Sequence, residues 1–352
     1  MSYCTIDNVN KDPNARLYTL STGEHVIQGL KKNSKCYLYF DELSLLSNII
    51  KNYNQSERSD LSSIYAENTT NTVFTADDNN GTTYYFAGNP TDNWVSFAGF
   101  YWRIVRVNGD GSIRMIYSGE DTGSVTEANR TGETTQIKTG AFNSVENDNA
   151  YVGYMYEIGQ VHGTKIDSTI KEELDNWYEN NIGNNNTYSN KLDGNAGFCG
   201  DRELYSGTGL ATTNTTYAAS NRLNTTRTPT FKCTNSNDLY TETNSNQGNR
   251  ALTYPIGLIT ADELWYAGAT LESTTNNFYL NTGENYWTMT PQGYRSNINT
   301  GVVFILTDIG FLYNPLNLTG SSSGIRPVIN LRADVTISSG DGTASNPYVI
   351  VA

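Results

Sequence analysis

The stretch that decides the fold is residues 284–331, which reads ENYWTMTPQGYRSNINTGVVFILTDIGFLYNPLNLTGSSSGIRPVINL. Three short runs in it have the length and the β-branched or aromatic content of strands, namely 286–289, 302–306 and 325–331. The stretches between them, 292–300 and 313–323, are polar and rich in Asn, Ser, Tyr and Gly. Polar and aromatic loops on a strand scaffold are typical of a recognition surface or of solvent-facing turns. We therefore expect a sheet that displays two loops.

A second strand signal lies upstream, in residues 97–119, which read FAGFYWRIVRVNGDGSIRMIYSG. Asn108-Gly109-Asp110-Gly111 supplies the positive φ angles that a tight hairpin turn needs. Strands 101–107 and 112–117 then bring together six apolar residues, Trp102, Ile104 and Val107 with Ile113, Met115 and Tyr117. Three arginines fall on or near the opposite face, Arg103, Arg106 and Arg114. We expect these arginines to be surface charges and not a ligand site.

Two helices are expected after residue 72, one in the middle of the chain and one before the opening stretch. Residues 168–182 have apolar positions at helical spacing, with Ser168 as N-cap and Gly183 as stop. Thr260 and Glu263 form a capping box that opens the second helix.

The chain is expected to have two parts. Residues 1–72 form a small helix and strand element with a linker, and residues 73–352 form the main domain. Residues 184–250 are long, polar and poor in periodicity, so we expect an insertion held by a disulfide.

Composition excludes several classes of partner. The 352 residues carry a net charge of −13 with a pI near 4.6, and no basic stripe is available for a nucleic-acid backbone or an anionic membrane surface. No apolar run reaches the ~18 residues of a membrane span, and no signal peptide opens the chain as given. We expect no nucleic-acid partner and no membrane insertion.

The four cysteines are Cys4, Cys36, Cys199 and Cys233, and none forms a CxxC pair. Three connectivities are possible, and the simplest pairs Cys4 with Cys36 and Cys199 with Cys233. Such disulfides predict an extracellular or cell-surface location. Four reduced, buried thiols in a cytosolic protein are the alternative.

The order of these elements resembles the C-type lectin-like fold. The resemblance rests on the 97–119 hairpin, YPIGLITADE (254–263), YWTMTP (286–291), Gly310 and GIRPVINL (324–331), and it covers roughly residues 73–352. Within that fold the chain is similar to the variable proteins of diversity-generating retroelements, which are bacterial or phage surface proteins. The resemblance implies an α+β fold with antiparallel sheets, two helices and long loops. It also implies a diversified C-terminal loop surface.

We expect the ligand-binding residues to share one exposed face: Tyr294, Arg295, Ser296, Asn297, Asn299, Tyr313, Asn314 and Asn317. The Glu-Pro-Asn, Gln-Pro-Asp and Trp-Asn-Asp calcium motifs of sugar-binding C-type lectins are absent from the sequence, so calcium-dependent sugar binding is not implied. The copper-binding Cys pair of the formylglycine-generating enzymes, which share the fold, is absent as well. Arg326 resembles a structural arginine of the closing segment.

No enzyme signature is present. The only histidines, His25 and His162, lie in unrelated segments, and no phosphate loop, Gly-x-Ser-x-Gly or HExxH motif occurs. We expect no catalytic residues, no metal and no cofactor. The expected function is an extracellular, adhesin-like protein that binds an unknown protein or glycan ligand on a cell surface. A pilin-like structural subunit of a surface appendage and a carbohydrate-active enzyme are the alternatives.

Overall fold

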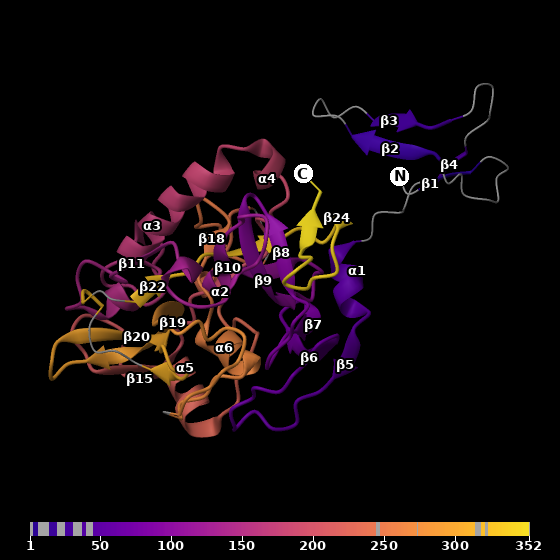
Figure 1. Ribbon diagram of the computed structural model, residues 1–352. Helices are drawn as coiled ribbons and strands as arrows, with labels where there is room; N and C mark the ends of the chain where they lie inside the picture. The colour runs from indigo at the N-terminus through magenta and orange to yellow at the C-terminus, as the bar shows by residue number, and fades with distance from the viewer. Residues whose placement is uncertain are drawn as a thin grey trace. The chain divides into compact units, whose positions relative to one another are not determined.

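The computed structural model describes residues 3–5, 14–19, 25–30, 37–39, 45–243, 247–272, 274–313, 318–320 and 323–351. The chain divides into two compact units, Met1–Ser44 and Leu45–Ala352 (Figure 1). The first unit contains two antiparallel pairs, β1 (Tyr3–Thr5) with β4 (Tyr37–Tyr39) and β2 (Arg16–Thr19) with β3 (His25–Gln28). Cys36 lies outside the described residues, and so does the predicted Cys4–Cys36 pair.

The boundary between the units lies between Ser44 and Leu45, whereas the sequence predicted it between residues 72 and 73. Helix α1 (Leu46–Lys51) buries Leu46 and Ile50 in the core of the second unit. Strand β5 (Asn54–Ser56), in the segment expected to be a linker, pairs in parallel with β6. The linker prediction fails because these polar residues contribute backbone hydrogen bonds to the edge of a sheet, which side-chain composition does not reveal.

The predicted hairpin forms the centre of a ten-stranded sheet. Strands β9 (Phe100–Val107) and β10 (Ile113–Glu120) are antiparallel, and Val107, Ile104 and Trp102 face Ile113, Met115 and Tyr117 as expected. Gly111 closes the turn with φ +89°, a conformation that L side chains rarely adopt.

Seven strands of this sheet follow one another in the spatial order β18 (Ile256–Gly257), β23 (Val328–Leu331), β10, β9, β7 (Gly81–Tyr85), β6 (Thr72–Asp78) and β5. The other three are β8 (Trp94–Phe97), which pairs with β9, then β25 (Tyr348–Ile350) and β24 (Ile337–Ser339).

A second sheet has seven strands and contains most of the opening stretch of sequence. Its order is β11 (Lys138–Gly140), β22 (Ser323–Ile325), β19 (Tyr286–Arg295), β16 (Thr215–Tyr217) and β15 (Leu204–Ser206), with β20 (Thr300–Leu306) on β19 and β21 (Leu312–Tyr313) on β20.

The predicted strand 325–331 is divided at Arg326 and Pro327, where the chain crosses from β22 in this sheet to β23 in the ten-stranded sheet. The Arg326 guanidinium is buried at the crossing and donates to the carbonyl oxygens of Tyr117, Thr135 and Leu280. Its structural role is thus consistent with the sequence prediction.

The predicted helices start where their caps place them. Helix α3 (Thr169–Tyr178) follows Ser168, whose Oγ accepts the backbone N–H of Lys171, and it continues as a π-helical turn, Glu179–Gly183. Helix α6 (Ala261–Ala267) opens with the Thr260–Glu263 capping box. The other α-helices of the described residues are short: α2 (Glu127–Arg130), α4 (Asn186–Ser189) and α5 (Ala218–Asn221).

Helix α6 contacts both sheets (Figure 1). The Ala261 backbone N–H donates to Thr290 Oγ1 on β19, and the Tyr266 ring lies 4.9 Å from the Tyr85 ring on β7. Helix α3 covers the hairpin, because Trp177 packs against the rings of Phe100 and Trp102. The second unit is therefore an α+β structure built mostly from sheet. Among the described residues, no helix has the length and apolarity needed to span a membrane.

The predicted insertion, 184–250, is ordered by short elements and by the expected Cys199–Cys233 disulfide, whose Cα atoms lie 5.6 Å apart. Strands β14 (Phe198–Cys199) and β17 (Leu239–Tyr240) pair beside this disulfide. Strands β12 (Met155–Tyr156) and β13 (Ile166–Asp167) form another small pair before the insertion. The insertion also supplies β15 and β16 to the seven-stranded sheet, so it is part of the scaffold.

Candidate functional site

The residues predicted to form one exposed face do not do so. Tyr294 is fully buried in β19, between Thr215 of β16 and Gly301 of β20, and its hydroxyl donates to Asn299 Oδ1 at 2.7 Å. The prediction that Tyr294 is exposed is wrong because β16, which belongs to the insertion, covers a segment that looks like a polar loop in sequence.

The remaining predicted residues are spread along the β19–β20 hairpin. Ser296, Asn297 and Asn299 are exposed at its tip, whereas Arg295 is half-buried and donates to Gln292 Oε1. Tyr313 is exposed but lies opposite Ile305, five residues along β20 from the tip, which is roughly 17 Å at strand spacing. Asn314 and Asn317 lie outside the described residues. The tip of the hairpin is therefore all that the structure shows of the predicted surface.

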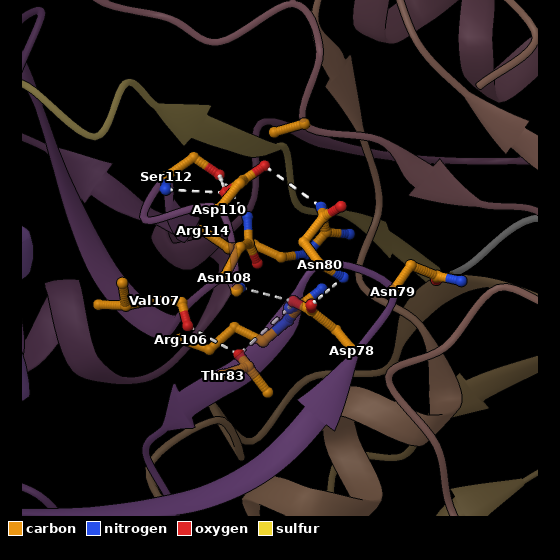
Figure 2. Close-up of polar contacts among 12 residues, drawn as sticks. Asp78, Asn79, Asn80, Thr83, Arg106, Val107, Asn108, Asp110, Ser112 and Arg114 are labelled. Carbon is orange, nitrogen blue, oxygen red and sulfur yellow. Dashed lines mark hydrogen bonds and ion pairs between the residues drawn. The ribbon is translucent and has the colours of Figure 1, made fainter. Parts of the chain in front are cut away.

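A pocket with about 60 Å³ of accessible space lies on the ten-stranded sheet. We call it the hairpin pocket. It is enclosed by the β6–β7 turn, the β9–β10 turn, the start of α6 and the disulfide-linked segments, and the residues that matter most here are Asn80, Arg106, Asn108, Asp110, Phe231 and Glu263. Figure 2 shows how the two turns converge, with Asn80 facing Asp110 and Asp78 facing Arg106.

The floor of the hairpin pocket is a buried network of charges. Glu263 Oε1 lies 2.5 Å from Arg114 Nε and 3.2 Å from Arg106 Nε. Asp78 Oδ2 accepts from Arg106 Nη1 at 3.0 Å and from the backbone N–H of Gly109 at 2.8 Å. The sequence analysis expected Arg106 and Arg114 to be surface charges, and this expectation is wrong. Only 8% of Arg106 and 1% of Arg114 is exposed.

The protonation states follow from this pairing. Burial by itself would raise the pKa of Glu263, but the guanidinium groups of Arg114 and Arg106 outweigh it and hold the pKa below the usual value. Burial lowers the pKa of Arg114 to about 10, which leaves the side chain charged at neutral pH. The floor is thus a fixed array of ionised groups.

A second charged group forms the side wall. Arg222 Nη2 lies 2.5 Å from Asp201 Oδ2 and 2.7 Å from Asp262 Oδ2. Burial raises the pKa of Asp201 to about 6, although Arg222 acts in the opposite direction. Phe231 stacks on Tyr266 with ring centroids 4.0 Å apart. The Arg106 guanidinium makes a cation–π contact with Phe231, 4.8 Å from the ring centroid.

Asn79 links the two sides of the pocket through hydrogen bonds. Its side-chain amide donates to the Cys233 carbonyl at 3.1 Å, and its Oδ1 accepts the Cys233 backbone N–H at 2.7 Å. The disulfide then links Cys233 to Cys199. The β6–β7 turn and the insertion are thereby held around the same opening.

Asn108, which lines the pocket, has a buried acceptor without a partner in the described part of the chain. Its amide nitrogen donates to Ser112 Oγ and Asn330 Oδ1, while its Oδ1 has no hydrogen-bond partner among the described residues. An unsatisfied buried carbonyl oxygen is costly and calls for a donor, such as water or a ligand hydroxyl.

Comparison with protein families, curated proteins and solved structures finds no match to this chain.

The described residues contain no group of three or more His, Cys, Asp or Glu side chains arranged to hold a metal ion. The hairpin pocket has hydrogen-bonding amides and carboxylates at its rim and paired charges on its floor. The Phe231 ring forms part of its wall.

Sequence reasoning missed this site because its floor joins residues far apart in the chain. Arg106 and Arg114 come from the hairpin and Glu263 from α6. One signal was available, since three arginines interrupt two otherwise apolar strands. Strands with that much apolar content are buried, and a buried arginine needs a partner.

Proposed function

We propose that this chain is an extracellular, adhesin-like ligand-binding protein whose hairpin pocket receives hydroxyl groups of a neutral ligand such as a glycan. The observation that carries the proposal is the pairing of a free acceptor, Asn108 Oδ1, with an amide and carboxylate rim and the Phe231 wall in one pocket. Sugar hydroxyls both donate and accept hydrogen bonds. One planar amide or carboxylate group can hydrogen-bond two neighbouring hydroxyls at once.

The balance of charge favours a neutral ligand. The described residues that line the pocket include four cations and five anions, namely Arg106, Arg114, Arg222, Lys232, Asp78, Asp110, Asp201, Asp262 and Glu263. The three arginines already have carboxylate partners. A charged ligand would have to compete with these buried ion pairs, whereas a neutral one can bind the remaining polar atoms.

We further propose that the second unit has a C-type lectin-like arrangement. In support, a β-hairpin is followed in sequence by helix α3, a disulfide-bearing segment, helix α6, the Trp287-bearing strand β19 and the closing strand β23, which pairs with β10 of the hairpin. The disulfide supports an oxidising, extracellular location. The exposed tip at Ser296, Asn297 and Asn299 is where a diversified surface of the retroelement type would tolerate substitution.

A glycan array tests the proposed function. The parent chain and the Asn80→Ala/Asp110→Asn variant are compared, because both positions are exposed at the pocket rim and outside the buried network. Asn297→Ala at the hairpin tip serves as the matched control. We expect binding to one class of neutral glycan, lost in the rim variant and kept in the tip variant. Absence of glycan binding by the parent, or equal binding by the rim variant, would overturn the proposal.

A further inference from the structure

A second hollow, separate in its lining from the hairpin pocket, surrounds Arg103. It has about 370 Å³ of accessible space, and we call it the Arg103 pocket. Three loops enclose it: the turn at residues 89–91, the end of α2 with Arg130 and Thr131, and the segment 277–281. Backbone hydrogen bonds hold them in place, because Tyr279 N–H donates to the Gly88 carbonyl and Gly132 N–H to the Thr282 carbonyl.

The Arg103 guanidinium is fixed within this pocket. It lies 4.2 Å from the Trp94 ring centroid and 5.0 Å from the Tyr279 ring centroid. Its Nε donates to Asn93 Oδ1 at 2.7 Å and its Nη2 to the Pro90 carbonyl at 2.9 Å. These bonds use Nε and Nη2 only, so a preorganised guanidinium presents its Nη1 end for a further contact.

Arg103 differs from the arginines of the hairpin pocket in its charge environment. It forms no ion pair with a carboxylate of the described residues, whereas Arg106, Arg114 and Arg222 all do. The acidic group that acts on it from nearby is Asp92, whose Oδ2 is engaged by the Asn71 backbone N–H at 2.6 Å.

Two neighbouring cations increase the positive potential at Arg103. Arg130 and Arg326 both act on it unfavourably. Burial lowers the pKa of Arg103 to about 9, and the group stays charged at neutral pH. No Asp or Glu is found among the described residues that line this pocket. A buried cation that forms no ion pair is costly unless an anion accompanies it.

Tyr279 supplies the second, independent observation. Its side chain is 8% exposed and lines the pocket, and its hydroxyl has no hydrogen-bond partner among the described residues. A buried hydroxyl without a partner is the exception in folded proteins. This unpaired hydroxyl is on the ring whose centroid lies 5.0 Å from the Arg103 guanidinium.

We propose that the Arg103 pocket binds an anionic oxygen group, a carboxylate, sulfate or phosphate, between Arg103, Arg130 and the Tyr279 hydroxyl. Charge-assisted hydrogen bonds from a guanidinium fork and a phenol match the geometry of such a group. The site is independent of the hairpin pocket, whose rim residues it does not share.

Isothermal titration calorimetry with sodium sulfate, sodium phosphate and sodium acetate tests this inference, at an ionic strength held constant with sodium chloride. Two variants reduce the site without disturbing the buried core: Arg130→Gln, since Arg130 is exposed at the rim, and Tyr279→Phe, which removes one oxygen. Arg332→Gln is the matched control, because Arg332 is an exposed arginine that does not line the pocket.

We expect saturable binding of at least one of the three anions by the parent chain, and the anion preferred identifies the group. Arg130→Gln and Tyr279→Phe should each weaken that binding by roughly three- to ten-fold, the loss of one charge-assisted or one ordinary hydrogen bond. Arg332→Gln should bind like the parent. No saturable binding by the parent, or affinities unchanged in both pocket variants, would overturn the inference.

Discussion

Glu263 Oε1 forms an ion pair with Arg114 Nε at 2.5 Å. The same Glu263 carboxylate also caps the start of helix α6. Glu263 Oε2 accepts the Thr260 backbone N–H at 2.9 Å, while Oε1 is shared by Arg106 and Arg114. One side chain therefore fixes the start of a helix and pairs with two buried guanidinium groups of the hairpin. The floor of the hairpin pocket depends on that double use.

Replacing this carboxylate should be strongly destabilising. Glu263→Gln keeps a residue that can complete the capping box but leaves Arg106 and Arg114 without their shared anion. Removing one partner of a buried ion pair costs about 3–5 kcal/mol in free energy of unfolding. Urea unfolding followed by circular dichroism measures it.

Glu173→Gln is the control for that experiment. Glu173 pairs with Lys138 at 2.9 Å, and both side chains are exposed to solvent, so the loss should stay below about 1 kcal/mol. Equal losses in the two variants would show that burial of the network does not matter for stability.

The disulfide should stabilise the insertion and the wall of the hairpin pocket. Cys199 and Cys233 are separated by 34 positions, and closing a loop of that size contributes about 3–4 kcal/mol in the chain-entropy model. The Cys199→Ser/Cys233→Ser double variant removes this disulfide alone. We expect a lower midpoint of urea unfolding and weaker glycan binding, because Phe231 lies two residues before Cys233. An unchanged midpoint of urea unfolding would contradict the prediction that the disulfide stabilises the folded chain.

His162 should make stability depend on pH. Its Nδ1 lies 2.8 Å from Asp238 Oδ1, and this hydrogen bond, with smaller contributions from nearby charges, raises the pKa of His162 above its ordinary value of 6.5. A raised pKa in the folded state adds stability that is fully present below pH 6.5 and is lost as the pH rises through the folded value.

The matched comparison for His162 is His162→Gln, measured between pH 5 and pH 9. The difference in free energy of unfolding between parent and variant should fall with rising pH, by no more than roughly 1 kcal/mol because the side chain is partly exposed to solvent. A difference that grows with pH, or that does not change, would contradict the charged pair.

The local part of the fold follows from the sequence, and the long-range part does not. The hairpin register, the Ser168 cap and the Thr260–Glu263 capping box depend on residues a few positions apart, and all are present. The burial of Tyr294 depends on Thr215, which reaches β19 from within the insertion. Periodicity in one segment carries no information about which distant strand will cover it.

The candidate site shows the same division. The Asn108–Gly111 turn was identified from its residue types, and it does supply Asn108 and Asp110 to the pocket. The burial of Arg114 was missed, because its partner Glu263 is in α6 and its aromatic neighbour Phe198 is in β14. Sequence alone could identify the turn but not the residues that meet it in space.

The hairpin tip should tolerate substitution where its supporting strand does not. Asn297→Ala, at an exposed position, should change the free energy of unfolding by less than about 0.5 kcal/mol. Tyr294→Phe removes the hydrogen bond to Asn299 Oδ1 and should cost about 0.5–1.5 kcal/mol. Thermal unfolding of both variants measures the contrast. A greater loss in Asn297→Ala would mean that the tip is part of the scaffold.

The most direct test of ligand binding in the hairpin pocket is hydrogen–deuterium exchange with and without a saturating neutral glycan chosen from the array. The proposal predicts slower exchange in the β6–β7 turn at residues 78–81, in the β9–β10 turn at 108–112 and in 230–233 beside the disulfide. Protection confined to the tip at 296–299, with exchange unchanged in the three pocket segments, would contradict it.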